Sequence, residues 1–513
     1  MDNDVKQNFS ERTFDNKKLQ GREKIIINVS QEQFESNPFE VFSNNIGVIT
    51  DIMEKNTQEI NYLKRYKKGL TDILEKIRAN NNNKINNISV CNFAHEIVEF
   101  KKGFTVGKPI KYVNESDETN EDMKYFHRYL KKVNKKSKDL DKYENLYTFG
   151  IAHTFTKYNP KCENTEIDSP FIYEVMDSTK TCCVYSSEIG NPKLFSMVES
   201  NITEVEDGLK KSYQLYTIYY GFNSIIIKKN GSNIEIFRGV KDEPNYDPIT
   251  EYSLNQERMG AFEPVISSLN TLNVIRSNQL DDIEQFVNAY LVFLNQDPQY
   301  IIKNIDSFRE KRVFALKTNN EKTPADVKTL QITLEHSDIN NIFNDTKQDV
   351  FNQVGVPMAT SSTGQGVSGE AQTYGGGWEN AQAISNIETT YCSQFEREDL
   401  EKFIYISNKV VNSVTNLIDV DIDIKYTINK SNNILTKMQS FKYWIDLGGT
   451  WERGLEITDL SDDSHIVGLE CEKNSLKVQE QKIELEVEKE KKLKALDQEN
   501  QNENQNDIIG SEN

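Results

Sequence analysis

The chain has 513 residues, of which 36% are hydrophobic and 27% are charged. This length suffices for two to four domains or for one elongated subunit, and the low apolar fraction favours an extended protein or one that buries surface on assembly. The 61 basic and 80 acidic side chains give a net charge of −19, which argues against a tight electrostatic grip on nucleic acid but not against contact with it.

The cysteines and the apolar runs indicate the compartment. The six cysteines show no paired metal-binding spacing, and we expect reduced thiols in an intracellular protein. No apolar run approaches the length of a membrane span, and the N-terminal segment MDNDVKQNFSER lacks the apolar core of a signal peptide. We therefore predict a soluble protein that is made in a cytosol and has no membrane partner.

The first part of the chain has a helical pattern. Residues 1–24 are polar and are predicted to be flexible. Apolar side chains at helical spacing predict helices over 37–77 and 85–104. A lysine-rich helix is predicted over 123–147, and we interpret its lysines as a solvated face rather than a nucleic-acid surface, because acidic residues follow closely.

A β-rich part follows. From 150 to 238 the pattern alternates between apolar and polar residues, which predicts strands, and Asn230-Gly231 predicts a hairpin turn. Residues 239–259 are rich in turn-forming residues. A long helix is then predicted from 263 to 295, with proline in its first turn.

A compact insert separates this helix from the next one. Residues 299–335 form the insert, and its strand-like segments lie at 300–302, 313–316 and 330–334. A short amphipathic helix is predicted over 336–354, and Gly355 and Pro357 end it.

The next segment is a long loop of small residues. Between 354 and 378 it holds no basic residue and one acidic residue, Glu370. Loops of this length are usually functional or disordered, so we expect a function here. A long helix is predicted from 378 to 412.

The C-terminal part is predicted to be helical apart from one strand. Strict alternation over 419–428 predicts a strand with one buried face. The segment 469–496 is dense in Glu and Lys and predicts a solvated helix or a partner helix. The polar tail from 497 is predicted to be disordered.

One glycine pattern suggests a nucleotide site. Gly364, Gly366 and Gly369 form G-x-G-x-x-G, and Glu388 follows at about the distance of a ribose partner. The motif requires a preceding strand, whereas a predicted helix and small residues precede it here. The match is therefore weak evidence for a dinucleotide site.

The remaining residues offer no catalytic constellation. The five histidines show no metal-ligand spacing. His153 and Cys162 would make a nucleophile pair only if a third group oriented them, and the sequence shows none. We predict no catalytic residue, no metal site and no cofactor, and hence no enzyme.

Three segments carry a resemblance to a known family. They are NNNKINNISVCNFAHEIVEFKKGFTVGKPIKY (81–112), FEPVISSLNTLNVIRSNQLDDIEQFVNAYLVFLNQ (262–296) and GVSGEAQTYGGGWENA (366–381). In this order, and over about residues 40–470, the chain resembles the portal proteins of tailed bacteriophages of the siphophage type.

The resemblance implies an α+β, mainly helical, elongated subunit that assembles into a ring, typically a homododecamer, at one vertex of the capsid. Its implied parts are a flexible N-terminus (1–24), a wing (25–258), a stem helix (259–296), a clip (297–335), a second stem helix (336–354), a tunnel loop (355–369), a long kinked wing helix (370–412), a crown (413–497) and a disordered tail (498–513).

The resemblance also implies the function and the partners. The ring would be the channel through which double-stranded DNA passes, without sequence specificity, during packaging and genome ejection. It would dock the terminase large subunit and later the head–tail adaptor, and would contact major capsid and scaffolding proteins. The protein would assemble in the host bacterial cytoplasm and reside in the virion. The rival hypotheses are another head–tail or minor capsid component, and a nucleotide-binding enzyme that uses the glycine loop.

The implied site residues fall into two groups. The expected DNA-facing residues of the tunnel loop are Pro357, Met358, Thr360, Ser361, Ser362, Thr363, Gly364, Gln365 and Gly366. Without basic side chains they offer weak, exchangeable contacts, which suits a channel that passes any sequence. The expected packing residues of the stem are Ile339, Ile342, Phe343, Val350, Phe286 and Tyr290.

Two departures from the family pattern concern the ends of these elements. Gly375 to Gly377 interrupt the start of the long helix, at a cost of about 1 kcal/mol each relative to alanine. The segment TEYSLNQERMGAF before the stem lacks the Gly-Ile-Pro turn that the resemblance implies, so the junction between wing and stem stays open.

Overall fold

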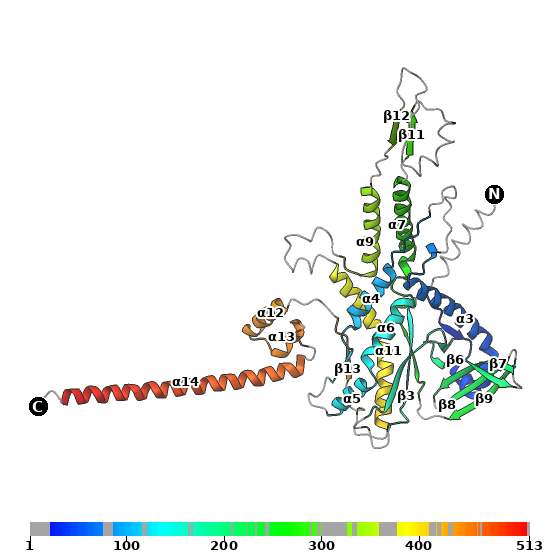
Figure 1. Ribbon diagram of the computed structural model, residues 1–513. Coiled ribbons are helices and arrows are strands. Elements are labelled where there is room, and N and C mark those ends of the chain that lie inside the picture. Colours follow the sequence, from blue (N-terminus) through cyan, green and yellow to red (C-terminus); the bar gives the residue numbers. More distant parts are fainter. Residues whose placement is uncertain are drawn as a thin grey trace.

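The computed structural model shows an elongated molecule in which a helical hairpin and one long helix project from a central body (Figure 1). The structure describes residues 21–74, 86–114, 121–162, 165, 168–206, 209–221, 223–230, 233–241, 246–287, 290–294, 299, 326–330, 336–358, 377–409, 417, 422–428, 434–458, 460–461 and 464–509. The combination of many helices with several sheets confirms the predicted fold class, α+β and mainly helical.

The β-rich part is built on a six-stranded sheet of order β1-β5-β6-β7-β8-β9. Its strands are β1 (Ile25–Ile27), β5 (Thr181–Ser186), β6 (Lys193–Glu206), β7 (Leu209–Tyr220), β8 (Asn223–Asn230) and β9 (Asn233–Lys241). The short β1 pairs with β5 in parallel, and the other neighbours are antiparallel. Asn230 pairs with Asn233, which confirms the predicted hairpin, although Gly231 itself lies outside the described residues.

Two helices cover this sheet and close a first core. They are α2 (Gln31–Ser36) and α3 (Pro38–Lys67). Phe42 of α3 packs against Phe195 of β6, with the ring centroids 6.4 Å apart. The predicted helix over 37–77 ends early, because Gly69 adopts φ +84° and the chain continues as a short 3-10 helix, η1 (Asp72–Leu74).

A second core joins helices to a three-stranded sheet of order β10-β3-β4. The elements are β3 (Ile151–Tyr158), β4 (Phe171–Met176), β10 (Ile249–Ser253), α4 (Phe93–Val106), α6 (Lys135–Phe149) and α11 (Trp378–Lys409). The prediction of turns over 239–259 missed β10. Every residue of β10 is buried, so its sequence shows none of the alternation that marks a half-exposed strand.

A third core lies along α11 and contains α5 (Glu121–Lys132) and the pair β2 (Lys111–Asn114) and β13 (Ile422–Lys425). β2 and β13 are antiparallel, which confirms a strand within 419–428. The prediction of a single helix over 123–147 is wrong. It is divided into α5 and α6 at Asn134, which adopts φ +53°, a left-handed conformation that asparagine tolerates and a helix does not.

The projecting hairpin consists of α7 (Ile266–Val287), which follows η2 (Glu263–Val265), and α9 (His336–Val354). The predicted helix over 263–295 is too long, because its last part forms β11 (Tyr290–Leu294) and pairs with β12 (Asp326–Leu330). The sequence YLVFL suits a strand. Phe286 lies in α7 as predicted, whereas Tyr290 lies on β11 rather than on a stem helix. The predicted strands at 300–302 and 313–316 lie outside the described residues.

The C-terminal part consists of α12 (Ile434–Asp446), α13 (Trp451–Thr458) and α14 (Ser464–Ile509). α14 extends away from the body (Figure 1). The prediction of a disordered tail is wrong as far as Ile509. Gln and Glu are good helix formers, and no glycine or proline interrupts the sequence between Gly468 and Gly510. Among the described residues, no helix has the length and apolar character that a membrane span requires.

Candidate functional site

α9 ends in a glycine cap, and the predicted tunnel loop starts there. Gly355 adopts φ +70°, and its N–H donates to the Asn352 carbonyl at 3.3 Å. The next N–H, that of Val356, donates to the Phe351 carbonyl at 2.8 Å. These are the two hydrogen bonds of a Schellman motif. The positive φ favours glycine here, and a Cβ added to Gly355 would lie 2.6 Å from Cδ1 of Ile384, so that side chain would also have to shift.

The chain returns beside the point where it left. Gly377 adopts φ +80°, and a Cβ built on it lies 3.8 Å from Cα of Pro357. Trp378 then opens α11, and its ring centroid lies 6.0 Å from those of Phe100 and Phe104 on α4. The two ends of the loop are therefore fixed at adjoining points on the body.

The structure describes part of the predicted loop. Pro357 lies at the closure point, and Met358 packs against the second core. The other predicted DNA-facing residues lie outside the described residues, namely Thr360, Ser361, Ser362, Thr363, Gly364, Gln365 and Gly366. Among the described residues, the element that precedes the G-x-G-x-x-G pattern is the helix α9, whereas a dinucleotide motif requires a strand there.

An extended segment, residues 86–92, lies along α7, and side chains of α7 accept its backbone hydrogen bonds. Asn87 N–H donates to Asp281 Oδ1 at 2.6 Å, Ser89 N–H to Ser277 Oγ at 3.0 Å and Cys91 N–H to Asn273 Oδ1 at 2.7 Å. The donors are two residues apart in the extended segment and the acceptors are four residues apart in the helix. These distances match, because two extended residues span about 6.6 Å and four helical residues rise about 6 Å. The helix predicted over 85–104 consequently begins only at Phe93.

Replacing Ser277 with alanine should lower the free energy of unfolding by about 1–3 kcal/mol, because the Ser89 N–H would lose its acceptor. Ser277 is fully buried. Urea unfolding measures the loss. Ser267→Ala, on an exposed position of the same helix, is the matched control, and an equal loss in both variants would show that the contact with segment 86–92 is not responsible.

The predicted packing residues on α9 divide into buried and exposed positions. Val350 is buried, and Phe343 packs against the second core. Ile339 is half-buried. Ile342 is 57% exposed in the single subunit, and its role in stem packing stays a prediction.

A buried ion network around Glu396 holds α11 in the body. Its Oε1 accepts from Lys135 Nζ at 2.6 Å and from Tyr112 OH at 2.5 Å. Its Oε2 accepts from Lys142 Nζ at 2.6 Å, and the Tyr252 OH lies 3.0 Å from it. Burial alone would raise the pKa of Glu396, but the two lysines outweigh burial and hold the pKa well below its usual range.

A second buried carboxylate, Asp399, ties α11 to the neighbouring sheet. It accepts from Thr154 Oγ1 at 2.9 Å, from Thr250 Oγ1 at 2.6 Å and from Tyr252 OH at 2.7 Å. These partners belong to β3 and β10. Together with Glu396, Asp399 fixes the long helix to strands from distant parts of the sequence.

The interpretation of the lysines over 131–138 as a solvated face is wrong for Lys135. Lys135 and Lys142 are buried, and both contact Asp139, at 2.6 Å and 3.1 Å. These three residues lie three or four positions apart and therefore on one helix face. That spacing of opposite charges was the sequence signal for a buried network.

Arg22 locks the N-terminal segment to the foot of α7. Its buried guanidinium contacts Glu59 at 3.0 Å and Glu263 at 2.5 Å. Its backbone N–H donates to the Arg258 carbonyl at 3.1 Å. The prediction of a flexible N-terminus is therefore wrong for residues 21–24, and this contact forms the junction before α7 that the sequence left open.

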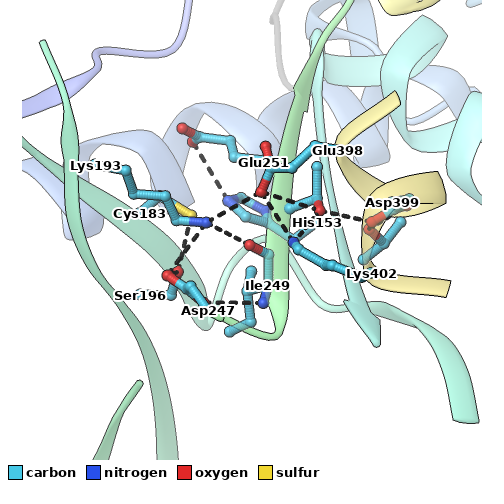
Figure 2. Close-up of polar contacts among 12 residues, drawn as sticks. His153, Cys183, Lys193, Ser196, Asp247, Ile249, Glu251, Glu398, Asp399 and Lys402 are labelled. Atoms are coloured by element: carbon cyan, nitrogen blue, oxygen red, sulfur yellow. Dashed lines mark hydrogen bonds and ion pairs between the residues drawn. The ribbon is translucent and has the colours of Figure 1, made fainter. Parts of the chain in front are cut away.

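His153, Cys183 and Glu251 meet where β3, β5 and β10 come together, and Figure 2 shows their side chains converging. One ligand atom from each lies within 4.8 Å of the others. Histidine, cysteine and carboxylate side chains are zinc ligands. The charges around the cluster show whether it suits a metal ion or an ion network within the protein.

Those charges favour a structural ion network. Arg258 Nη2 lies 2.6 Å from Glu251 Oε1, and Tyr185 OH donates to the same carboxylate at 2.8 Å. The negative charge of Glu251 is therefore already balanced. Burial raises the pKa of the Cys183 thiol to about 12, which leaves it a neutral, poor ligand. Lys193 adds a further positive charge beside Cys183 (Figure 2).

The chain was compared with curated proteins and with protein-family models. No curated protein matches the chain. The family model described as "Phage portal protein, SPP1 Gp6-like" matches residues 46–444, which contain both helices of the hairpin, the loop closure and the Glu396 network. The chain therefore belongs to the family of SPP1 Gp6-like phage portal proteins, a structural, non-enzymatic family of the capsid vertex and the head–tail connection.

Proposed function

We propose that the chain is one subunit of a ring, typically a dodecamer, that forms the DNA channel at the capsid vertex. The ring takes part in packaging and in ejection, docking first the terminase large subunit and then the head–tail adaptor. The observation that carries the proposal is the loop closure, in which Pro357 and Gly377 adjoin at the foot of the α7–α9 hairpin. Both ends of the segment that contains the predicted tunnel loop, which has no basic residue, are thus held beside the hairpin.

The chemistry of that segment supports passage rather than binding. Residues 354–378 contain no basic side chain, so the segment lacks the ammonium and guanidinium groups that neutralise phosphates. The net charge of −19 further reduces adhesion of DNA to the subunit. Double-stranded DNA of any sequence can then slide through the ring.

Exposed apolar side chains on the hairpin support assembly. Leu280 and Ile283 of α7 are 38% and 48% exposed, and Ile342 of α9 is 57% exposed. A soluble subunit that keeps several apolar side chains in water on one projecting element gains free energy when a neighbour covers them. In the proposed ring the neighbour is the next copy of the hairpin.

The proposed parts follow the implied division, and we adapt their boundaries to the helices and strands described above. They are a wing (21–258, with α11), a stem (α7 and α9), a clip (290–335, with β11 and β12), the tunnel loop (355–376) and a crown (α12 to α14). Capsid and scaffolding proteins are the proposed partners of the wing and crown, and assembly takes place in the host bacterial cytoplasm.

Negative-stain microscopy of the purified chain tests the ring directly. We expect rings with a central channel, either spontaneously or after incubation with scaffolding protein. Particles that remain monomeric under every assembly condition would contradict the proposal. Nucleotides should leave the thermal midpoint unchanged, whereas a clear upward shift would favour a nucleotide-binding enzyme.

Replacing Ser361 and Thr363 with arginine should slow or stall DNA packaging, because each subunit would add two phosphate contacts to the channel wall. Packaged DNA per capsid, measured by protection from nuclease, gives the readout. The matched control is Ser361→Ala with Thr363→Ala, which removes the hydroxyls without adding charge. Unchanged packaging by the arginine variant would show that these residues do not face the DNA.

A further inference from the structure

α14 extends away from the body as a single helix (Figure 1). Its start is tied to α13, since a Cβ built on Gly468 would lie 2.9 Å from Cα of Glu452. Beyond this contact its apolar side chains are exposed, and they are Leu476 (54%), Val478 (49%), Ile483 (61%), Leu485 (56%), Val487 (45%) and Leu493 (64%). A solvated helix needs none of these side chains, so their presence indicates a partner.

The apolar side chains form two stripes on nearly opposite faces. Leu476, Ile483 and Val487 make stripe A, and Val478 and Leu485 make stripe B. The offset of two residues between the stripes turns the helix by about 200°. Within each stripe the heptad spacing matches a contact between supercoiled helices. Leu493 lies to one side of stripe B.

Opposed stripes determine the kind of assembly. In a two- or three-stranded coiled coil the apolar positions converge on one axis, so each helix carries one apolar face. A helix with two opposed faces packs between two neighbours, one on each side. A closed ring of identical subunits supplies these neighbours if stripe A of one copy meets stripe B of the next.

The charges beside the stripes favour this pairing. On a helical projection, Glu486 and Glu490 border stripe A on the side where Lys482 and Lys489 border stripe B. When parallel helices pack A against B, these carboxylates face these ammonium groups. Packing A against A would instead leave Lys482 and Lys489 away from these carboxylates, with Lys491 of the other copy opposite Glu486.

We propose that α14 of each subunit packs between the α14 helices of its two neighbours, stripe A against stripe B, so that the helices form a closed sleeve at the crown end of the ring. The sleeve rests on the proposed ring. It gives neighbouring subunits a second interface, remote from the α7–α9 hairpin, and the partner it recognises is another copy of this chain.

Cross-linking tests which stripes meet. The partly exposed native thiols Cys91, Cys162 and Cys471 are first replaced by serine in the full chain. Ile483→Cys and Leu485→Cys are then introduced singly and together, and a short bis-maleimide is added to assembled particles. The double variant should give a ladder of covalent multimers on denaturing gels, whereas each single variant should stay monomeric.

Each other outcome overturns the proposal in a recognisable way. Dimers from one single variant would show that like stripes pair. Rings visible by negative stain without a ladder from the double variant would show that the sleeve does not exist, although the ring does. Absence of rings in the unmodified chain would overturn the proposed function itself, and the sleeve with it.

A charge exchange provides an independent check. Glu486→Lys with Glu490→Lys should reduce the cross-linking yield of the double cysteine variant several-fold, because like charges would then face each other. Adding Lys482→Glu and Lys489→Glu should restore the yield. A yield that the first exchange leaves unchanged, or that the second fails to restore, would contradict the A-against-B arrangement.

Discussion

Replacing Glu396 with glutamine should lower the free energy of unfolding by about 3–5 kcal/mol, which is the usual cost of breaking a buried ion pair from one side. Lys135 and Lys142 would stay buried without the carboxylate that both contact at 2.6 Å. The amide would also direct N–H groups at one of the two ammonium groups. Urea unfolding followed by tryptophan fluorescence measures the loss. Glu401→Gln, at an exposed position of the same helix, should change the stability by less than about 0.5 kcal/mol.

The pH dependence gives this prediction a second readout. Because the folded-state pKa of Glu396 lies below its unfolded value, its stabilisation is present above about pH 4.3 and is lost as the pH falls towards the lowered pKa. Glutamine does not titrate. The difference in stability between the unmodified chain and Glu396→Gln should therefore narrow below about pH 4. A constant difference down to pH 2 would show that the carboxylate charge is not the cause.

Replacing Ile342 with aspartate should abolish ring formation and leave the subunit folded. Ile342 is 57% exposed on α9, so a charge there costs little within the chain, typically within about 0.5 kcal/mol. In the proposed ring the same charge would be buried between neighbouring hairpins, where an unpaired carboxylate is strongly unfavourable. Light scattering gives the oligomeric state, and urea unfolding gives the stability.

Asn341→Asp is the matched control, because it adds the same charge at the neighbouring exposed position of α9. Rings should persist in this variant. Normal rings from Ile342→Asp would place this face of the hairpin in solvent. A large loss of stability in the monomer would mean instead that Ile342 packs inside its own subunit.

Patterns that reflect local chemistry predicted much of the fold. The alternation before 238 predicted β4 to β9, and α9 matches its predicted span from His336 to Val354. The errors lie in segments whose secondary structure depends on a contact with a distant part of the chain. Segment 86–92 has apolar residues compatible with a helix, yet α7 offers acceptors for its extended backbone. Sequence periodicity carries no information about that partner.

The candidate site was predicted less completely for a similar reason. The loop without basic residues, and the end of the preceding helix at Gly355, were apparent from the sequence. The Glu396 network was not, because its members come from β2, α6, β10 and α11, and no local pattern relates them. Only the Lys135–Asp139–Lys142 spacing pointed to it, and a mixed charge run is usually solvated.

The adjoining positions of Pro357 and Gly377 have a consequence for how members of this family diverge. When the ends of a loop are already held together by the body, lengthening the loop costs only the logarithmic closure term, about 0.6 kcal/mol for each doubling. Insertions and deletions there leave the rest of the subunit undisturbed. If the loop lines the channel as proposed, the channel lining can vary in length and composition while the rest of the subunit keeps its structure.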